Sequence, residues 1–130
     1  MEQQDEGFPG GTEMPRVEID RSEPTAGIVV LRGEHDEYTA LKLQLSLVGL
    51  LEEGRALIVD LTEATFVDST VVGVLLAARE QAEARGTKLL VVMDETTGPA
   101  VRRLFDLAGL RSVLPAAESR REALAACACS

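Results

Sequence analysis

The chain has 130 residues and a formal net charge of -9, and 45% of its residues are hydrophobic while 27% are charged. This size and composition predict one globular domain with a core of its own. The acidic charge and an aromatic content of 3% argue against nucleic-acid binding, which needs basic patches and exposed aromatic rings. Because the sequence contains neither a long apolar span nor a signal-peptide pattern, we expect a cytoplasmic protein that does not insert into membranes.

Residues 1–14 combine glycine, proline and acidic residues without periodicity, which predicts a flexible acidic tail. Two strands are predicted next. In "RVEID", Val17 and Ile19 alternate with polar residues, as in a half-buried strand, and "TAGIVVLRGE" contains a longer apolar run. Proline and glycine in the intervening "RSEPTAG" predict that the two strands form a hairpin.

The stretch 38–51, "YTALKLQLSLVGLL", is predicted to be an amphipathic helix. Its apolar residues at helical spacing are Leu41, Leu45, Val48 and Leu51. Asp36 would cap the start of this helix and Gly54 would end it. The leucines of this stretch also alternate with other residues, a pattern that fits a strand, so both structures remain open at this point.

The run "ALIV" at 56–59 is continuously apolar, which is typical of a central strand. Phe66 and Val67 are then expected in a loop, and Asp68-Ser69-Thr70 at the start of a helix that ends at Gly86.

The rest of the chain continues this alternation. "TKLLVVMD" is predicted to be a buried strand, "TGPAVRRLFDLAGL" a short helix, "RSVLP" a last short strand and "ESRREALAACA" a final helix. Strands that alternate with helices after an initial hairpin predict an α/β domain with a mixed, mostly parallel central sheet flanked by helices.

The triplet Asp68-Ser69-Thr70 is the most informative polar feature. The first turn of a helix has amide groups without intrahelical partners, so an aspartate or serine there is first of all an N-cap. One hydroxyl would suffice for a cap, however, and two are present. The loop after the carboxyl end of a strand is also where functional residues of open α/β sheets are found. Both interpretations apply to this triplet.

Three motifs follow one another in the chain: "LRGEHDEYTA", "LIVDLTEATFVDST" and "VRRLFDLAGLRSVLP". In combination they resemble the STAS domain, specifically the anti-sigma factor antagonists of bacterial partner switching. The resemblance covers residues 15–115 and leaves 116–130 as a C-terminal helix and tail. It implies a STAS fold without cofactor or catalytic activity. It also implies that an anti-sigma factor with ATP-dependent serine kinase activity phosphorylates Ser69. The unphosphorylated form would bind this partner, the phosphorylated form would release it, and a cognate phosphatase would reset the cycle.

The same resemblance implies a partner surface around Ser69. The residues expected there are Asp36, Asp68, Thr70, Val71 and Val72. Asp36 and Asp68 have an alternative role as helix caps, and Thr70 is either a second acceptor or a first-turn hydroxyl.

We also predict the roles of four residues near this surface. Val71 stands where the family commonly has glycine, so it could narrow the approach to Ser69. His35 replaces a usual aliphatic residue and is expected on the surface. Gly73 would allow close helix packing, and Arg79 would be a solvated charge.

Other classes of function have less support. With one histidine and no glycine-rich phosphate loop, the sequence offers little for nucleophilic catalysis. A receiver-like phosphoaspartate site built from Asp36, Asp60, Asp68 and Asp94 would need a lysine after a late strand, and Lys88 begins its strand instead. Nothing specific indicates a nucleotide or lipid-like ligand. Cys127 and Cys129 lack further metal ligands and are interpreted as inert thiols. The nearest alternative is a STAS module that is never phosphorylated and acts as a scaffold or accessory subunit.

Overall fold

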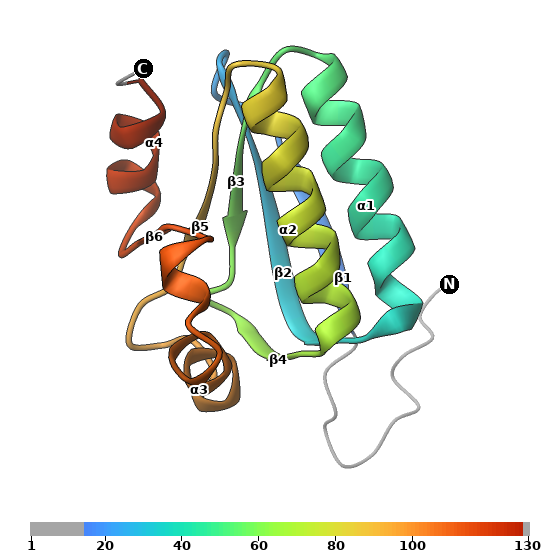
Figure 1. Cartoon of the computed structure of the whole chain (residues 1–130), viewed down its shortest axis with the longest axis vertical. Coiled ribbons are helices and arrows are strands. Elements are labelled where there is room, and N and C mark those ends of the chain that lie inside the picture. The colour runs from blue at the N-terminus through green and yellow to red at the C-terminus, as the bar shows by residue number, and fades with distance from the viewer. Residues whose placement is uncertain (1–14, 129–130) are drawn as a thin grey trace.

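The structure, a computed structural model, describes residues 15–128 (Figure 1). The predicted tail at 1–14 and Cys129 lie outside these residues. The elements in chain order are β1 Arg16–Asp20, β2 Ala26–His35, α1 Glu37–Glu52, β3 Ala56–Asp60, β4 Ala64–Val67, α2 Ser69–Ala84, β5 Leu89–Val92, α3 Pro99–Leu107, a 3-10 helix Leu110–Ser112, β6 Ala116–Ala117 and α4 Arg120–Ala128.

The described strands form one mixed sheet in the order β1-β2-β3-β5-β6, with β4 paired separately to β2. β1 and β2 are antiparallel, with Val17 opposite Leu31, which confirms the predicted hairpin. The other pairs are parallel. All five residues of β3 are buried, as expected for a central strand covered on both faces. The predicted α/β class with a mostly parallel sheet is therefore confirmed.

Helices cover both faces of this sheet. α1 and α2 lie side by side on one face, whereas α4 packs against the other (Figure 1). Side chains alternate accordingly along β2: Val29 and Leu31 join the core under α1 and α2, while Ile28 and Val30 face α4. α3 lies against β4 at the end of the sheet where the parallel strands finish (Figure 1).

Close packing of α1 on the sheet depends on Gly27 in β2. A Cβ atom at this position would lie 2.7 Å from both terminal methyl carbons of Leu50, too close for a real contact. The absence of a side chain at Gly27 therefore allows α1 to approach the strand.

The helix predicted at 38–51 is confirmed, but its buried face differs from the prediction. The buried residues of α1 are Ala40, Leu43, Leu47, Leu50 and Leu51. Leu41 and Leu45, which were expected to face the core, are 62% and 63% exposed. Too many leucines lie along α1 for one face to hold them all, so the helix has a second, exposed apolar stripe.

Phe66 and Val67 do not belong to a loop, contrary to the prediction from sequence. They end strand β4, which pairs in parallel with the last part of β2. β3 pairs with β2 only as far as Val30, so the rest of this ten-residue strand needs another partner for its backbone groups. β4 is this partner. A turn in which the Ala64 amide donates to the Leu61 carbonyl at 3.0 Å brings the chain back from β3 to β2.

The prediction of a strand at "RSVLP" is wrong. Gly109 has a φ of 65° and ends the preceding helical segment, and residues 110–112 form a 3-10 helix. Leu114 then turns into the core, and the edge strand forms later, at Ala116–Ala117. The helix predicted after it is confirmed as α4, which covers the second face of the sheet.

Candidate functional site

The pairing of β2 with β4 places the starts of α1 and α2 next to each other. His35 and Val67 are direct partners in this parallel ladder, and the Asp68 amide donates to the His35 carbonyl at 3.1 Å. Asp36 and Asp68 each follow the last residue of one strand. Two helix N-termini with an aspartate at each therefore lie side by side at the same end of the sheet.

Both aspartates act as helix N-caps, as the sequence predicted. A carboxylate oxygen of Asp36 accepts a hydrogen bond from the Tyr38 amide at 2.9 Å, and the Asp36 side chain is exposed. Asp68 accepts from the Val71 amide at 3.1 Å and is half-buried. Each bond satisfies an amide that the helix itself leaves without a partner. Capping therefore holds both carboxylates in defined positions beside the end of the sheet.

Ser69 and Thr70 are the first two residues of α2, and both are exposed. Their hydroxyls are accessible to a modifying enzyme without unfolding of the helix. The positive end of the helix dipole also favours an anionic group at this position. The site thus combines an accessible hydroxyl, a neighbouring cap and a favourable local field.

The two valines that follow do not belong to this surface. Val71 is fully buried and Val72 is 9% exposed, and both pack in the core between the sheet and the helices. Their burial leaves little of either side chain at the surface, so the two valines are not included in the surface described here. For the same reason Val71 does not stand in front of the Ser69 hydroxyl.

Gly73 lies one helical turn after Ser69 and is exposed, with no atom within 4 Å of a Cβ built on it. The prediction that it allows close helix packing is wrong. Arg79, two turns further, pairs with Glu83 at 2.9 Å on the helix surface. The outer face of α2 next to Ser69 therefore begins with small side chains.

His35 is 1% exposed, so the expectation of a surface histidine is wrong. Its Nε2 donates to the Arg32 carbonyl at 2.9 Å, and its Nδ1 lies 3.0 Å from Oγ1 of Thr39. Burial lowers the pKa of His35 below its usual value because desolvation disfavours the charged ring. This histidine joins the end of β2 to the first turn of α1 and so supports the position of Asp36.

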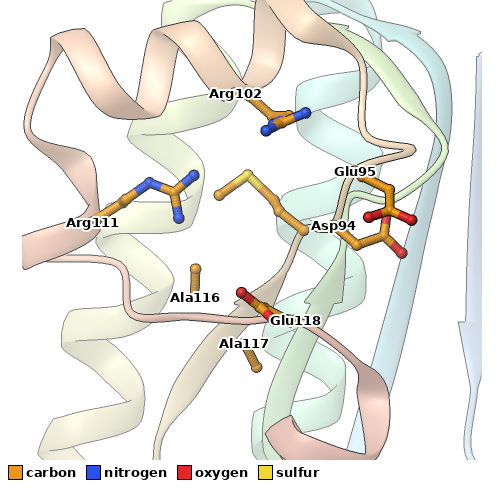
Figure 2. Close-up of a pocket in the computed structure, with 8 residues that line it drawn as sticks. Asp94, Glu95, Arg102, Arg111, Ala116, Ala117 and Glu118 are labelled. Carbon is orange, nitrogen blue, oxygen red and sulfur yellow. The ribbon is translucent and has the colours of Figure 1, made fainter.

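A hollow of about 530 Å³, separate from the Ser69 surface, opens beyond the ends of β5 and β6. Figure 2 shows Arg102 and Arg111 facing the carboxylates of Glu95 and Glu118 across it. The lining residues are Met93, Asp94, Glu95, Arg102, Arg111, Ala116, Ala117 and Glu118. None of the residues predicted around Ser69 lines it. Arg111 already pairs with an aspartate of α3, and the mixed charges of the rim largely compensate one another.

The aspartates considered for a receiver-like site are engaged in other roles in the fold. Asp60 is 4% exposed, and its carboxylate accepts hydrogen bonds from Arg120 at 2.7 Å and from Thr62. Arg120 belongs to α4, on the face of the sheet opposite the two capped helices. The pKa of Asp94 is lowered by hydrogen bonds from Thr96, which bind this carboxylate into its own turn. Within residues 15–128 no three histidine, cysteine, aspartate or glutamate side chains are grouped to hold a metal ion.

Sequence comparison identifies the fold. The family model described as the STAS domain matches residues 16–123. The chain belongs to the STAS domain family. The match includes the capped helix pair, Ser69 and the sheet as far as β6. Across the described part of this STAS domain, no helix is long and apolar enough to cross a membrane.

Relatives of this STAS domain narrow the family further. The anti-sigma-B factor antagonist of Bacillus subtilis (strain 168) is 33% identical over 86 residues, which are 66% of this chain and 76% of the relative. A crystal structure of an anti-sigma factor antagonist from Mycobacterium paratuberculosis has a TM-score of 0.76 and 27% identity, covering 88% of this chain and 95% of the other. The STAS domain described here is therefore a member of the anti-sigma factor antagonists.

The fold is also shared with the Bacillus protein SpoIIAA, an anti-sigma factor antagonist solved in two forms. The unphosphorylated form has a TM-score of 0.70 and 21% identity, covering 84% of this chain and 93% of SpoIIAA. The phosphorylated form has a TM-score of 0.65 and 19% identity, covering 85% and 98%. Both structures have the same architecture as this STAS domain.

Proposed function

We propose that this STAS domain is a phosphorylation-controlled antagonist that binds an anti-sigma factor through the surface around Ser69. The observation that supports this most directly is the position of the Ser69 hydroxyl. It is exposed at the start of α2, directly after the Asp68 cap, and next to the Asp36 cap of α1. The existence of a relative in a phosphorylated form with the same fold agrees with a modification that leaves the architecture intact.

Phosphate on Ser69 would act at the interface and not on the fold. It adds about -1.5 to -2 charges, which the N-terminus of α2 tolerates because of its dipole. In a complex, however, the same group would be desolvated beside Asp68 and Asp36. Burying an imperfectly paired charge across an interface costs about 2–5 kcal/mol, which corresponds to about 30- to 4,000-fold in affinity. This is enough for release of the partner without a conformational change.

The partner surface consists of Asp36, Asp68, Ser69 and Thr70, with the exposed Gly73 next to them. Two carboxylates on a chain of net charge -9 call for a partner with basic side chains at the contact. In the proposed cycle that partner is an anti-sigma factor that also phosphorylates Ser69 with ATP. A separate phosphatase then restores the binding form.

The first test is the modification itself. The protein is purified from its native cells under several growth conditions, its intact mass is measured, and any phosphate is mapped to a residue. Phosphate on Ser69 in a fraction that changes with conditions would support the cycle. A Ser69 that is unmodified under every condition would contradict it and favour a STAS scaffold that works without phosphorylation.

The second test is binding to the cognate anti-sigma factor. Ser69→Ala should bind constitutively, and Ser69→Glu should bind at least about 30-fold more weakly than the unphosphorylated protein. Ser22→Glu is the matched control, because Ser22 is exposed in the turn before β2, at the opposite end of this ten-residue strand. Equal affinities for Ser69→Glu and Ser22→Glu would show that the α2 start is not the contact.

A further inference from the structure

An apolar groove of about 500 Å³ lies between α1 and β1, and neither Asp68 nor Ser69 lines it. Its residues are Ile19, Arg21, Tyr38, Leu41, Lys42, Leu45, Ser46 and Gly49. Tyr38, Leu41 and Leu45 follow one another along α1 at i, i+3 and i+7 and are all exposed, so they form an apolar stripe. An exposed apolar surface with a polar rim is typical of a protein contact.

The strand beside this stripe has an open edge. In the order β1-β2-β3-β5-β6 of the described strands, β1 has a partner on one side only. The backbone N–H and C=O groups on its outer side are therefore available to a further strand. Ile19 points into the groove, whereas Asp20 pairs at 3.6 Å with Arg120 of α4, on the other face of the sheet. One partner can consequently contact both the open edge of β1 and the apolar stripe of α1.

The sequence of β1 is complementary to a second copy of itself. The strand reads Arg16-Val17-Glu18-Ile19-Asp20. When two copies pair antiparallel about a two-fold axis, residues at equal distances on either side of the axis are partners. Only an axis through Glu18 pairs all five residues. It places Arg16 of each copy opposite Asp20 of the other, and Val17 opposite Ile19. Opposite charges and apolar side chains at such cross-strand positions both stabilise the pair.

The side chains that would meet are also accessible within one copy. Arg16 and Asp20 reach their own charged neighbours at 3.6 Å, which is longer than a hydrogen bond. Ile19 is 38% exposed. The charges at both ends of β1 can therefore pair with a second copy without breaking a short ion pair of the first.

We propose that this STAS domain forms a two-fold dimer in which the β1 strands of two copies pair antiparallel about Glu18. The sheet then continues from one molecule into the next, and the apolar stripes of the two α1 helices come together over the joined strands. The start of α2 does not belong to this contact, so the dimer is independent of phosphorylation on Ser69.

The centre of the contact limits its strength. Two Glu18 carboxylates lie opposite each other there, and like charges weaken a cross-strand pair. Each of them accepts a hydrogen bond from Arg32 of its own copy at 3.1 Å, which compensates part of the charge. We therefore expect a reversible dimer. Glu18→Gln keeps an acceptor for Arg32 and removes the repulsion, so it should tighten the dimer about 1.4- to 5-fold.

Sedimentation equilibrium of the full chain over a range of concentrations measures this association. Leu45→Ser should weaken the dimer about ten-fold. Leu107→Ser, the same change at an 80% exposed leucine of α3, is the matched control and should not alter it. A protein that is monomeric at every concentration would overturn the proposal, and so would a dimer that Leu45→Ser leaves unchanged. If the chain is monomeric and Leu45→Ser instead weakens its binding to the anti-sigma factor, the groove belongs to that partner and the proposal is wrong.

A charge exchange tests the pairing of the two strand ends. Arg16→Asp and Asp20→Arg should each weaken the dimer about 2- to 30-fold, because each variant alone brings like charges together. An equimolar mixture of the two variants should associate as well as the wild type, because every cross-strand position then has opposite charges again. Circular dichroism verifies that both variants are folded. A mixture that associates no better than either variant alone would contradict the register.

Disulfide cross-linking tests the position of the axis. In a chain that carries Cys127→Ser and Cys129→Ser, Glu18→Cys places one thiol of each copy beside the two-fold axis. Directly opposite residues of antiparallel strands have Cα atoms about 4.5–5.5 Å apart, which a disulfide can span. Oxidised glutathione should therefore give a covalent dimer that dithiothreitol separates. Glu83→Cys, exposed on α2, is the matched control and should stay monomeric. Equal cross-linking of the two variants would show that β1 does not pair as proposed.

Discussion

Replacing Asp68 with alanine tests whether the cap of α2 stabilises the domain as well as placing Ser69. The change removes the 3.1 Å bond from the Val71 amide, while the Asp68 amide keeps its bond to the His35 carbonyl. Loss of an N-cap side chain costs about 0.5–2 kcal/mol, typically about 1 kcal/mol. Loss of a carboxylate at a helix N-terminus adds about 0.3–1 kcal/mol. Since Asp68 is half-buried and makes one capping bond, we expect the free energy of unfolding to fall by about 1–2 kcal/mol.

Urea unfolding followed by circular dichroism measures this change, with an m-value equal to that of the wild type. Asp68→Asn is the matched control, because asparagine keeps the oxygen acceptor and caps about as well as aspartate. It should lose only the electrostatic part, about 0.3–1 kcal/mol. If Asp68→Ala is as stable as the wild type, or no less stable than Asp68→Asn, the capping bond does not contribute as inferred.

Gly27→Ala should lower the free energy of unfolding by about 1–3 kcal/mol, because its Cβ would lie 2.7 Å from a side chain of α1, whereas Gly73→Ala should raise it by about 0.5–1 kcal/mol. Urea titrations compare the two, and an equal response would contradict the packing described. Burial lowers the folded-state pKa of His35, so the unfolded chain binds the proton first and stability should fall as the pH drops below about 6.5. The slope, at most about 1.4 kcal/mol per pH unit, should flatten in His35→Gln, and an identical slope would refute this origin. Arg120→Ala should lower the free energy of unfolding by about 1–3 kcal/mol, because Asp60 stays buried without its hydrogen-bond partner at 2.7 Å. Calorimetry measures this change, and an unchanged stability would mean that the pair does not stabilise α4.

The predicted element order held along most of the chain because its signals are local. Asp36 and Asp68 are caps whose bonds reach only two or three residues ahead. The ends of α1 and α2 were likewise marked by Gly54 and Gly86, both with positive φ. The start of α2, and with it the position of Ser69 in the first helical turn, could therefore be predicted without knowledge of the rest of the molecule.

The errors occurred where a distant strand or helix decides the outcome. Phe66 is in a strand because the end of β2 needs a partner, and no neighbour of Phe66 in the sequence indicates this. The side of α1 that is buried depends on where the sheet lies, so Leu41 and Leu43 could not be distinguished by their spacing alone. His35 is buried although its neighbours in the sequence, Glu34 and Asp36, are exposed.

The sequence by itself determined the class of fold, the family resemblance and the serine at the start of a capped helix. These depend on patterns within short stretches, where spacing, caps and turn residues act on their own neighbours. Only the tertiary structure decided that Asp36 stands beside Asp68, that Val71 and Val72 are buried in the core, and that α1 exposes an apolar stripe. Those facts depend on which surfaces meet, and a parallel β2–β4 pair is formed between residues about thirty positions apart. Contacts over such a separation are set by the packing of the whole sheet, which no local pattern of residues describes.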